Sequence, residues 1–469
     1  MMASPRGAQR GAAERSPRDG PGRELVAEAL ELAARAGADA ADCLLLESDA
    51  FEARVRGDEV DFVKQAREHT LGLRALVRGS GGFRSAVTST SDLSPAALAE
   101  LAAASAALAR ETAPDPFAGL PEDGFAGEGP DLRLLEPLDR EVSPQEHIAA
   151  ARRAEAAARA ADPRIANSEG SDVGSAFTVV TYGSSAGFLG SYECASHSLA
   201  CQPLARENGS QQRDHWFTAA RRRAELETPE AVGRRAAERA LRRLGARRVP
   251  TCEVPVIFDA LTAPSLLGQL AGCLAGSAVY REASCLAGRL GERIASDLVS
   301  VVDDGLRPGG LGSRPFDGEG QASRRTPLLA RGRLESYLLD SYAARKLGMR
   351  STGSAGRSPG GPPFVSPANL WLEPGPASLA EIVADTKRGL LVTELIGMGF
   401  NPVTGDYSRG AAGIWIEGGA LTHPVEEVTI AGNLLEMLLA IDAVGSDLEW
   451  RGRIASPSLR IAKLTVAGT

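Results

Sequence analysis

The sequence predicts an α+β fold of two domains, each built from mostly antiparallel sheets with flanking helices. Stretches with helical and with strand-like periodicity occur in separate runs rather than in regular alternation. The gaps between neighbouring strand-like stretches are of hairpin size, whereas a doubly wound parallel sheet needs a crossover helix between strands. The composition, 43% hydrophobic and 24% charged, is typical of globular proteins and excludes a disordered or fibrous architecture.

The first domain is expected over residues 23–222, and its helices have clear start or stop signals. The first helix is followed by Gly37. Two Ala-rich helices are expected to begin at Asp92 or Ser94 with Pro95, and at Ser143-Pro144, because proline fits a first helical turn. Helices are expected over residues 23–36, 95–108 and 144–161, and strands over 43–46, 51–56, 70–78, 82–88, 177–182 and 186–194.

A helix that begins at Thr228-Pro229 and reaches residue 243 is expected to connect the domains, within residues 223–250. Its arginines could form a basic patch, but the acidic whole and the interleaved Glu238 favour a solvated helix face. These arginines are Arg234, Arg235, Arg239, Arg242 and Arg243.

The second domain is expected over residues 251–469. Residues 264–274 are apolar on nearly every side, which predicts a buried helix. Further helices are expected over 341–347 and 432–443, and strands over 254–258, 298–302, 326–330, 334–339, 389–395, 412–417, 425–430 and 459–466.

Charge and composition exclude several classes of protein. The 52 Lys and Arg residues against 60 Asp and Glu give a net charge of -8, which argues against a nucleic-acid-binding protein. No apolar run is long enough to span a bilayer, so no membrane association is expected. Residues 1–22 lack the apolar core of a secretory signal and are expected to form a disordered leader. Six cysteines without paired spacing favour a cytoplasmic location.

Few residues are available for metal chemistry, since the chain has five histidines and no H-E-x-x-H motif. Cys194, His197 and Cys201 have a spacing that would place them on one face of a helix. In the strand expected there, Cys194 points away from the other two, which favours three unrelated half-buried side chains over a metal site.

Other polar motifs have a structural and a functional interpretation. Residues 183–187, GSSAG, match the G-x-S-x-G pattern, but strand on both sides favours a hairpin turn over a nucleophile elbow. Asp303-Asp304 and Asp317 with Glu319 could bind a cation or act in acid–base chemistry, although capping of turns explains them equally simply. The loop 401–410 is a candidate partner or substrate loop, with a plain hairpin as the alternative. Its candidate residues are Asn401, Gly405, Asp406, Tyr407, Ser408, Arg409 and Gly410.

A series of motifs in the second half resembles the TldD/PmbA family, also called modulator-of-gyrase or microcin-processing peptidases. The motifs are LGERIAS at 290–296, VVDDG at 301–305, FDGEG at 316–320, YAARKLG at 342–348, STG at 351–353, GDYSRG at 405–410 and TIAGNL at 429–434. The resemblance covers roughly residues 254–468 and extends more weakly over the first domain. It implies a two-domain α+β fold and a heterodimer of two related chains.

The resemblance also implies where a metal would bind in the sister chain of the TldD type. There H-E-x-x-x-H on a helix and a late cysteine hold zinc, with the glutamate as base. Counted back without gaps from Gly291, this hexad falls on residues 267–272, so Leu267 and Gly272 fill the ligand positions and Gly268 the base position. Leucine and glycine side chains have no lone pair, and residues 445–458 contain no cysteine.

This chain therefore resembles the PmbA (TldE) type, without a catalytic or metal site of its own. We expect a non-catalytic subunit of a heterodimeric zinc metallopeptidase that shapes a shared chamber for unfolded peptides, with zinc in the partner subunit. Strand addition at an exposed sheet edge is the expected mode of peptide capture. Two alternatives stay open: a peptidase with an unrelated site, and a self-dimerising scaffold without proteolytic role.

Overall fold

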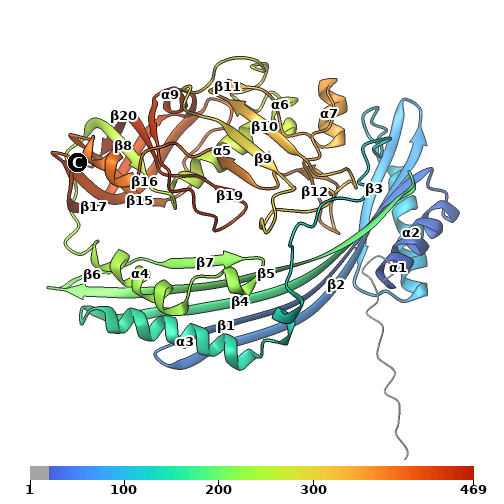
Figure 1. Cartoon of the computed structure of the whole chain (residues 1–469). Coiled ribbons are helices and arrows are strands. Elements are labelled where there is room, and N and C mark those ends of the chain that lie inside the picture. The colour runs from blue at the N-terminus through green and yellow to red at the C-terminus, as the bar shows by residue number, and fades with distance from the viewer. Residues whose placement is uncertain (1–20, 469) are drawn as a thin grey trace, which may run out of the picture.

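The computed structural model describes residues 21–468 and confirms the α+β fold with mostly antiparallel sheets (Figure 1). One long sheet forms the N-terminal part, and several smaller sheets form the C-terminal part above it in this view. The predicted leader, residues 1–22, lies outside the described residues except for its last two, which begin the first helix. No helix of residues 21–468 is long and apolar enough to cross a membrane.

The N-terminal sheet is antiparallel throughout, with the strand order β3-β2-β1-β4-β5-β6 and with β7 paired to β5. Its strands are β1 (Ala40–Arg56), β2 (Glu59–Gly79), β3 (Gly82–Thr90), β4 (Ile165–Ser184), β5 (Phe188–Glu207), β6 (Ser210–Arg213) and β7 (Trp216–Ala220). Several of these strands are longer than expected. Three of the residues 47–50 are polar, but all four pair with β2 on one side and β4 on the other, which joins the two short strands predicted around them.

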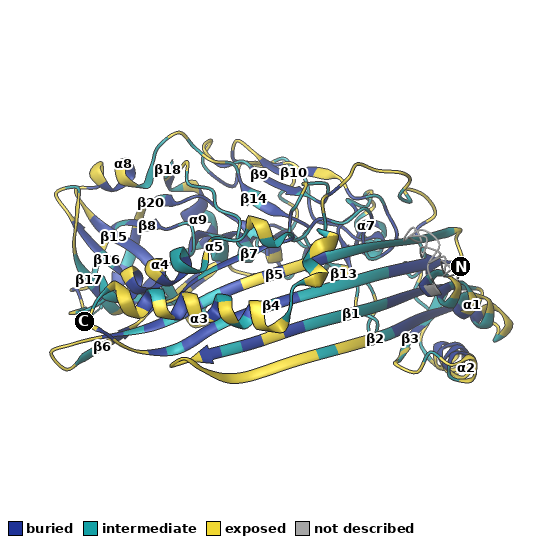
Figure 2. Cartoon of the chain, turned by 60° about the horizontal axis from the view of Figure 1, so that its bottom comes forward, coloured by how far each residue is buried: buried dark blue, intermediate teal, exposed yellow. Residues whose placement is uncertain are grey.

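Four helices cover one face of this sheet (Figure 2). They are α1 (Pro21–Arg35), α2 (Pro95–Glu111), α3 (Pro144–Ala161) and α4 (Pro229–Leu241). Side chains alternate between the faces of a strand, and in β1 the odd-numbered Cys43 and Phe51 pack under helices. The even-numbered Leu44 packs with Tyr182 and with Phe316 of the C-terminal part. The sheet therefore separates a helical layer from the C-terminal domain.

The largest C-terminal sheet closes on itself, because β17 pairs with both β16 and β20. Its strands are β8 (Cys252–Phe258), β15 (Arg388–Ile396), β16 (Asp406–Glu417), β17 (Ala420–Asn433), β18 (Ile441–Val444) and β20 (Leu459–Ala467). A second sheet contains β9 (Val301–Asp304), β10 (Arg325–Ala330), β11 (Arg333–Leu334), β14 (Leu370–Leu372) and β19 (Ile454–Ala455), and β12 (Ala355–Gly356) pairs with β13 (Phe364–Val365). One hydrophobic core joins the closed sheet, the second sheet and helix α5 (Ala263–Leu274).

Short helices complete this domain: α6 (Gly276–Val279), α7 (Ser341–Leu347), α8 (Leu379–Ala384) and α9 (Leu434–Leu439). The helix predicted over 432–443 is too long, because β18 follows and pairs with β20. The strand predicted over 334–339 ends at Leu334. Beyond it, Leu338 hydrogen-bonds through its N–H to Leu274 at the end of α5, so contact with this helix replaces pairing in the sheet.

Candidate functional site

Helix α5 is the candidate site. The resemblance implies that a sister chain of the TldD type carries its metal ligands on the corresponding helix. The helix begins where Asp259 Oδ1 accepts hydrogen bonds from the backbone N–H of Leu261 at 3.1 Å and of Thr262 at 2.9 Å. Pro264 stands in its first turn. The helix is packed into the core of the C-terminal domain, as its apolar composition predicts.

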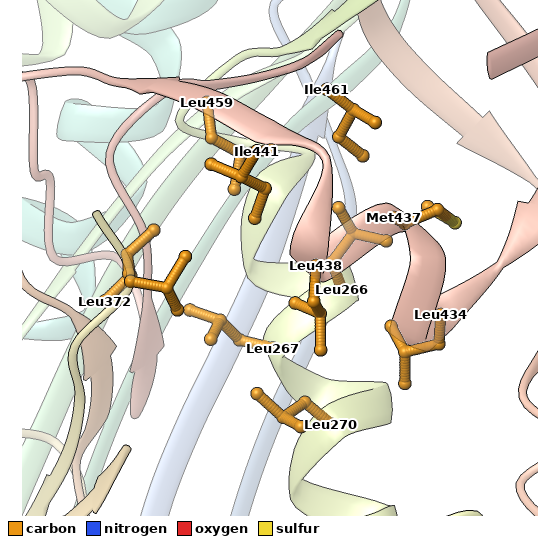
Figure 3. A pocket seen from close by; sticks show the side chains of 11 residues that line it. Leu266, Leu267, Leu270, Leu372, Leu434, Met437, Leu438, Ile441, Leu459 and Ile461 are labelled. Atoms are coloured by element: carbon orange, nitrogen blue, oxygen red, sulfur yellow. The ribbon is translucent and has the colours of Figure 1, made fainter. Parts of the chain in front are cut away.

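Leu267 lines a small apolar pocket between α5, α9 and neighbouring strands, which we call the α5 pocket (Figure 3). Its volume is about 20 Å³, close to that of a single water-sized probe. The lining consists of Leu266, Leu267, Leu270, Val299, Leu372, Leu434, Met437, Leu438, Ile441, Leu459 and Ile461. None of these side chains carries nitrogen or oxygen, so the α5 pocket does not fit a zinc ion.

The two glycines of the hexad, Gly268 and Gly272, do not line the α5 pocket. Gly268 is half-buried, and a Cβ built there would come no nearer than 3.8 Å to Ile454. Gly272 is exposed, with open space within 4 Å of such a Cβ. Within residues 21–468, no group of three or more His, Cys, Asp or Glu side chains is placed to hold a metal ion.

The candidate loop 401–410 divides into an exposed hairpin tip and the first residues of β16. Asn401 belongs to the tip, and the N–H of Gly405 donates to its carbonyl at 2.8 Å. Asp406, Ser408 and Gly410 pair with β17 at positions 433, 431 and 429, within the TIAGNL segment. The GDYSRG and TIAGNL motifs therefore lie side by side on the paired strands β16 and β17.

Two side chains of this segment point inward. Tyr407 is buried in the core, and burial raises the pKa of its hydroxyl to about 12. Arg409 Nη1 donates to Ser265 Oγ in the first turn of α5 at 2.5 Å. Of the predicted loop residues, Arg409 is the one that lines a cleft between the domains.

This interdomain cleft has a volume of about 410 Å³ and lies between β7, α4 and the start of α5. Its lining combines cationic and anionic groups, namely His215, Arg239, Glu394, Arg409, Glu449 and Arg451, with apolar and small residues. The lining therefore presents groups of both charge signs to any molecule that enters the cleft.

The prediction of a solvated basic face on α4 is wrong for part of the helix. Arg234 and Arg235 are exposed, but Arg239 is buried, and its Nε donates to Asp214 at 3.2 Å. Arg243 forms an ion pair with Glu394 of β15 at 2.5 Å. The C-terminal domain supplies part of this burial, and an isolated helix sequence does not reveal it.

The alternative metal residues lie on one strand, as predicted. His197 Nδ1 hydrogen-bonds to Ser175 Oγ at 3.0 Å, and burial lowers the pKa of its imidazole. Cys201 lies against the carbonyl of Ala154 in α3. Residues 185–187 form the turn between β4 and β5, so GSSAG is a hairpin turn and not a nucleophile elbow.

The carboxylates of the turns accept hydrogen bonds from backbone N–H groups. Asp303 accepts from Ala368 at 2.8 Å, and burial raises its pKa to about 7. Asp304 accepts from Leu306 at 2.8 Å. These bonds support the capping interpretation for this pair.

The second pair of carboxylates is buried and has the same role. Asp317 accepts from the N–H groups of Glu319, Gln321 and Ala355 at 2.9–3.0 Å. Glu319 accepts from the N–H of Ser341 at 2.8 Å, and burial, with the nearby Asp317, raises its pKa to about 7. The FDGEG motif thus connects α7 and β12.

Two groups of residues were not singled out from the sequence. Asp42 of β1 forms ion pairs with Arg74 of β2 and with Arg357 of the C-terminal domain, at 2.6 Å for Arg357. Cys273 and Cys285 bring their sulfur atoms within 3.9 Å. The first group has no local signal, because Arg357 lies 315 positions from Asp42, whereas the twelve-residue spacing of the two cysteines is a local pattern.

Comparison with known proteins identifies the class. Models of the PmbA/TldA metallopeptidase domain 1, central domain and C-terminal domain match residues 41–109, 137–244 and 251–468. "Metalloprotease PmbA" of Escherichia coli O157:H7 is 39% identical over 447 residues, which cover 95% of this chain and 96% of that protein. The chain belongs to the PmbA/TldD family, as its motifs predicted.

Two solved structures share the fold. A protein from Bacteroides thetaiotaomicron, described as a modulator of DNA gyrase, superposes with a TM-score of 0.87 and 29% identity, over 95% of this chain and 99% of that one. TldE from Thermococcus kodakarensis gives a TM-score of 0.85 at 23% identity, over 95% and 100% of the two chains. The second likeness shows the fold alone.

Proposed function

We propose that this chain is the non-catalytic subunit of a heterodimeric TldD/TldE-type metallopeptidase that cleaves unfolded peptides. The observation that carries the proposal is the apolar lining of the α5 pocket around Leu267. In the proposal, a sister chain of the TldD type presents its zinc ligands and its base from the corresponding helix. This helix instead contributes to the hydrophobic core, so it stabilises the subunit and leaves the chemistry to the partner.

The subunit's own contribution is a surface that can hold an extended chain. In the described part of the molecule, residues 59–70 of β2 pair with β1 on one side only, since β3 reaches no further than Leu71. Figure 2 shows this edge as exposed, and Phe62 and Val63 on it are 40% and 51% exposed. Free backbone donors and acceptors at such an edge can pair with an unfolded peptide, which supplies a reason for selecting unfolded substrates.

Reconstitution tests the proposal. The full chain alone should hydrolyse no unfolded peptide, such as an unstructured casein, and an equimolar TldD-type subunit should restore hydrolysis. The matched control is a partner in which the glutamate of its H-E-x-x-x-H is replaced, which should assemble equally well and remain inactive. Hydrolysis by this chain without any partner would overturn the proposal.

The name of the relative "Metalloprotease PmbA" favours one rival, a chain that is itself a peptidase. Its candidate groups would be Cys194, His197 and Cys201, or the carboxylates of the turns, although His197 is hydrogen-bonded to Ser175. If the isolated chain is active and His197→Ala abolishes that activity, the rival holds. Sedimentation with and without the sister chain separates the remaining alternative, a self-dimerising scaffold, because only a scaffold would prefer its own copy.

A further inference from the structure

Two cysteines lie in contact near the end of α5. Cys273 is buried in the last turn of the helix, and Cys285 is half-buried in the segment that follows α6. Their Sγ atoms are 3.9 Å apart. All six cysteines of the chain lie within the described residues, and no other two of them are in contact there.

Neighbouring groups hold both cysteines in place. The carbonyl oxygen of Pro402, in the exposed hairpin tip, accepts a hydrogen bond from the N–H of Cys285 at 2.7 Å and lies 3.9 Å from Cys273 Sγ. Ser284 Oγ donates to the carbonyl of Cys273 at 2.7 Å. The backbone on each side of the thiol pair is therefore fixed by direct contacts between the two segments.

We propose that Cys273 and Cys285 form a redox-active dithiol that low-molecular-weight disulfides such as glutathione disulfide oxidise to an intrachain disulfide. A disulfide bond requires sulfur atoms about 2.0 Å apart, so rotation of the side chains must close the remaining gap. Cys285 is the half-buried member and therefore the one an oxidant can reach first.

The local electrostatics favour Cys285 as the attacking group. The hydrogen bond between the thiols lowers the pKa of Cys285 to about 7 and raises that of Cys273. A thiolate is the nucleophile in thiol–disulfide exchange, and a thiol with a pKa near ambient pH reacts fastest. Cys273 then serves as the resolving thiol.

The exchange proceeds in two balanced steps. The Cys285 thiolate attacks one sulfur of glutathione disulfide, a mixed disulfide forms, and one glutathione thiolate leaves and takes up a proton. Cys273 loses its proton and attacks Cys285 Sγ, which breaks the mixed disulfide and releases the second glutathione. In total, two protein thiols and one glutathione disulfide give one protein disulfide and two glutathione molecules.

The crosslink would join the end of α5 to the segment after α6, where the N–H of Cys285 donates to the carbonyl of Pro402 in the hairpin tip. Val403 in the tip is 53% exposed, and Met398, three residues before Asn401, is 94% exposed. Oxidation therefore restrains the backbone group of Cys285 that holds Pro402 in the hairpin tip. This redox device is independent of whether the chain is catalytic.

Mass spectrometry of the full chain incubated with glutathione disulfide tests the proposal. The expected product has lost two of its six thiols, and its proteolytic map contains a peptide that joins residues 273 and 285. Cys273→Ser and Cys273→Ala should stop at the mixed disulfide on Cys285, and Cys285→Ser should form neither product. Cys252→Ser, which removes another half-buried thiol, is the matched control and should form the crosslink normally.

Three results would overturn the proposal. The first is wild-type protein that retains six thiols, and the second is glutathione on Cys285 that persists without a crosslink. The third is a crosslink that involves any of the other four cysteines. The proteolytic map of the oxidised wild-type protein tests the proposal even if substitution of the buried Cys273 prevents folding.

Discussion

Asp303 illustrates how a single buried carboxyl can control stability in this molecule. It is 4% exposed in β9, and its Oδ1 accepts a hydrogen bond from Ala368. Burial raises its pKa from 3.8 to about 7, because the charged form is poorly solvated there. The folded state therefore retains a proton that the unfolded chain releases near pH 4, and stability is lost as pH rises from about 4 to 7.

Asp303→Asn should weaken this pH dependence, because asparagine keeps an acceptor oxygen and has no charge to bury. The variant should gain, relative to wild type, on the order of 2 kcal/mol between pH 5 and pH 8. Thermal unfolding followed at several pH values measures the difference. Equal slopes for wild type and Asp303→Asn would contradict the assignment.

Helix α5 shows how one element can be core in one place and surface in another. Leu267 is 4% exposed in the α5 pocket, whereas Gly272 is exposed with no atom near its missing side chain. The residues at positions 267, 268 and 272 therefore do not face one shared site. The contribution of each position to stability can be measured separately.

Leu267→Ala should destabilise the protein by roughly 2–5 kcal/mol, because it removes buried methyl groups and enlarges a cavity. Gly272→Ala should be neutral or stabilise by up to about 1 kcal/mol, since alanine favours the helix and meets no neighbour. Urea unfolding of the two variants beside wild type measures both values. A Leu267→Ala protein as stable as wild type would show that this helix is not the core element described above.

Elements with local signals could be predicted, and those that depend on distant partners could not. Helices α2, α3 and α4 begin after Ser94, Ser143 and Thr228, whose hydroxyls accept from the first helical turn, as the sequence patterns indicate. The length of β1 depends on pairing with β2 and β4 across polar residues, which periodicity does not detect. The end of α9 depends likewise on the pairing of β18 with β20.

The candidate site was predictable to a similar extent. Motif spacing located Leu267 on a buried helix, since apolar residues surround it in the sequence. The sequence pattern predicts one loop over residues 401–410, but Tyr407 and Arg409 face inward from strand β16. Whether a polar side chain meets solvent or a second domain depends on the docking of domains, as Arg239 also shows.

At the scale of the whole molecule, a buried charge cluster fixes the two domains together. Arg357 of the C-terminal domain reaches Asp42 at the sheet face, and although burial opposes it, Arg357 and Arg74 hold the pKa of Asp42 below its usual value. The same loop passes directly over Gly72, where a Cβ would lie 1.9 Å from the carbonyl oxygen of Pro359. This close approach needs glycine, so the sheet and the C-terminal domain are in direct backbone contact here.

We propose that the two domains of this chain belong to a peptidase whose metal lies in the partner chain. The most direct measurement is the zinc content of the complex co-purified with a TldD-type subunit, by inductively coupled plasma mass spectrometry. We predict one zinc ion per pair of chains, lost when the partner's H-E-x-x-x-H histidines are replaced and retained in His197→Ala of this chain. Two zinc ions per pair, or zinc that remains after the partner's ligands are removed, would contradict the account.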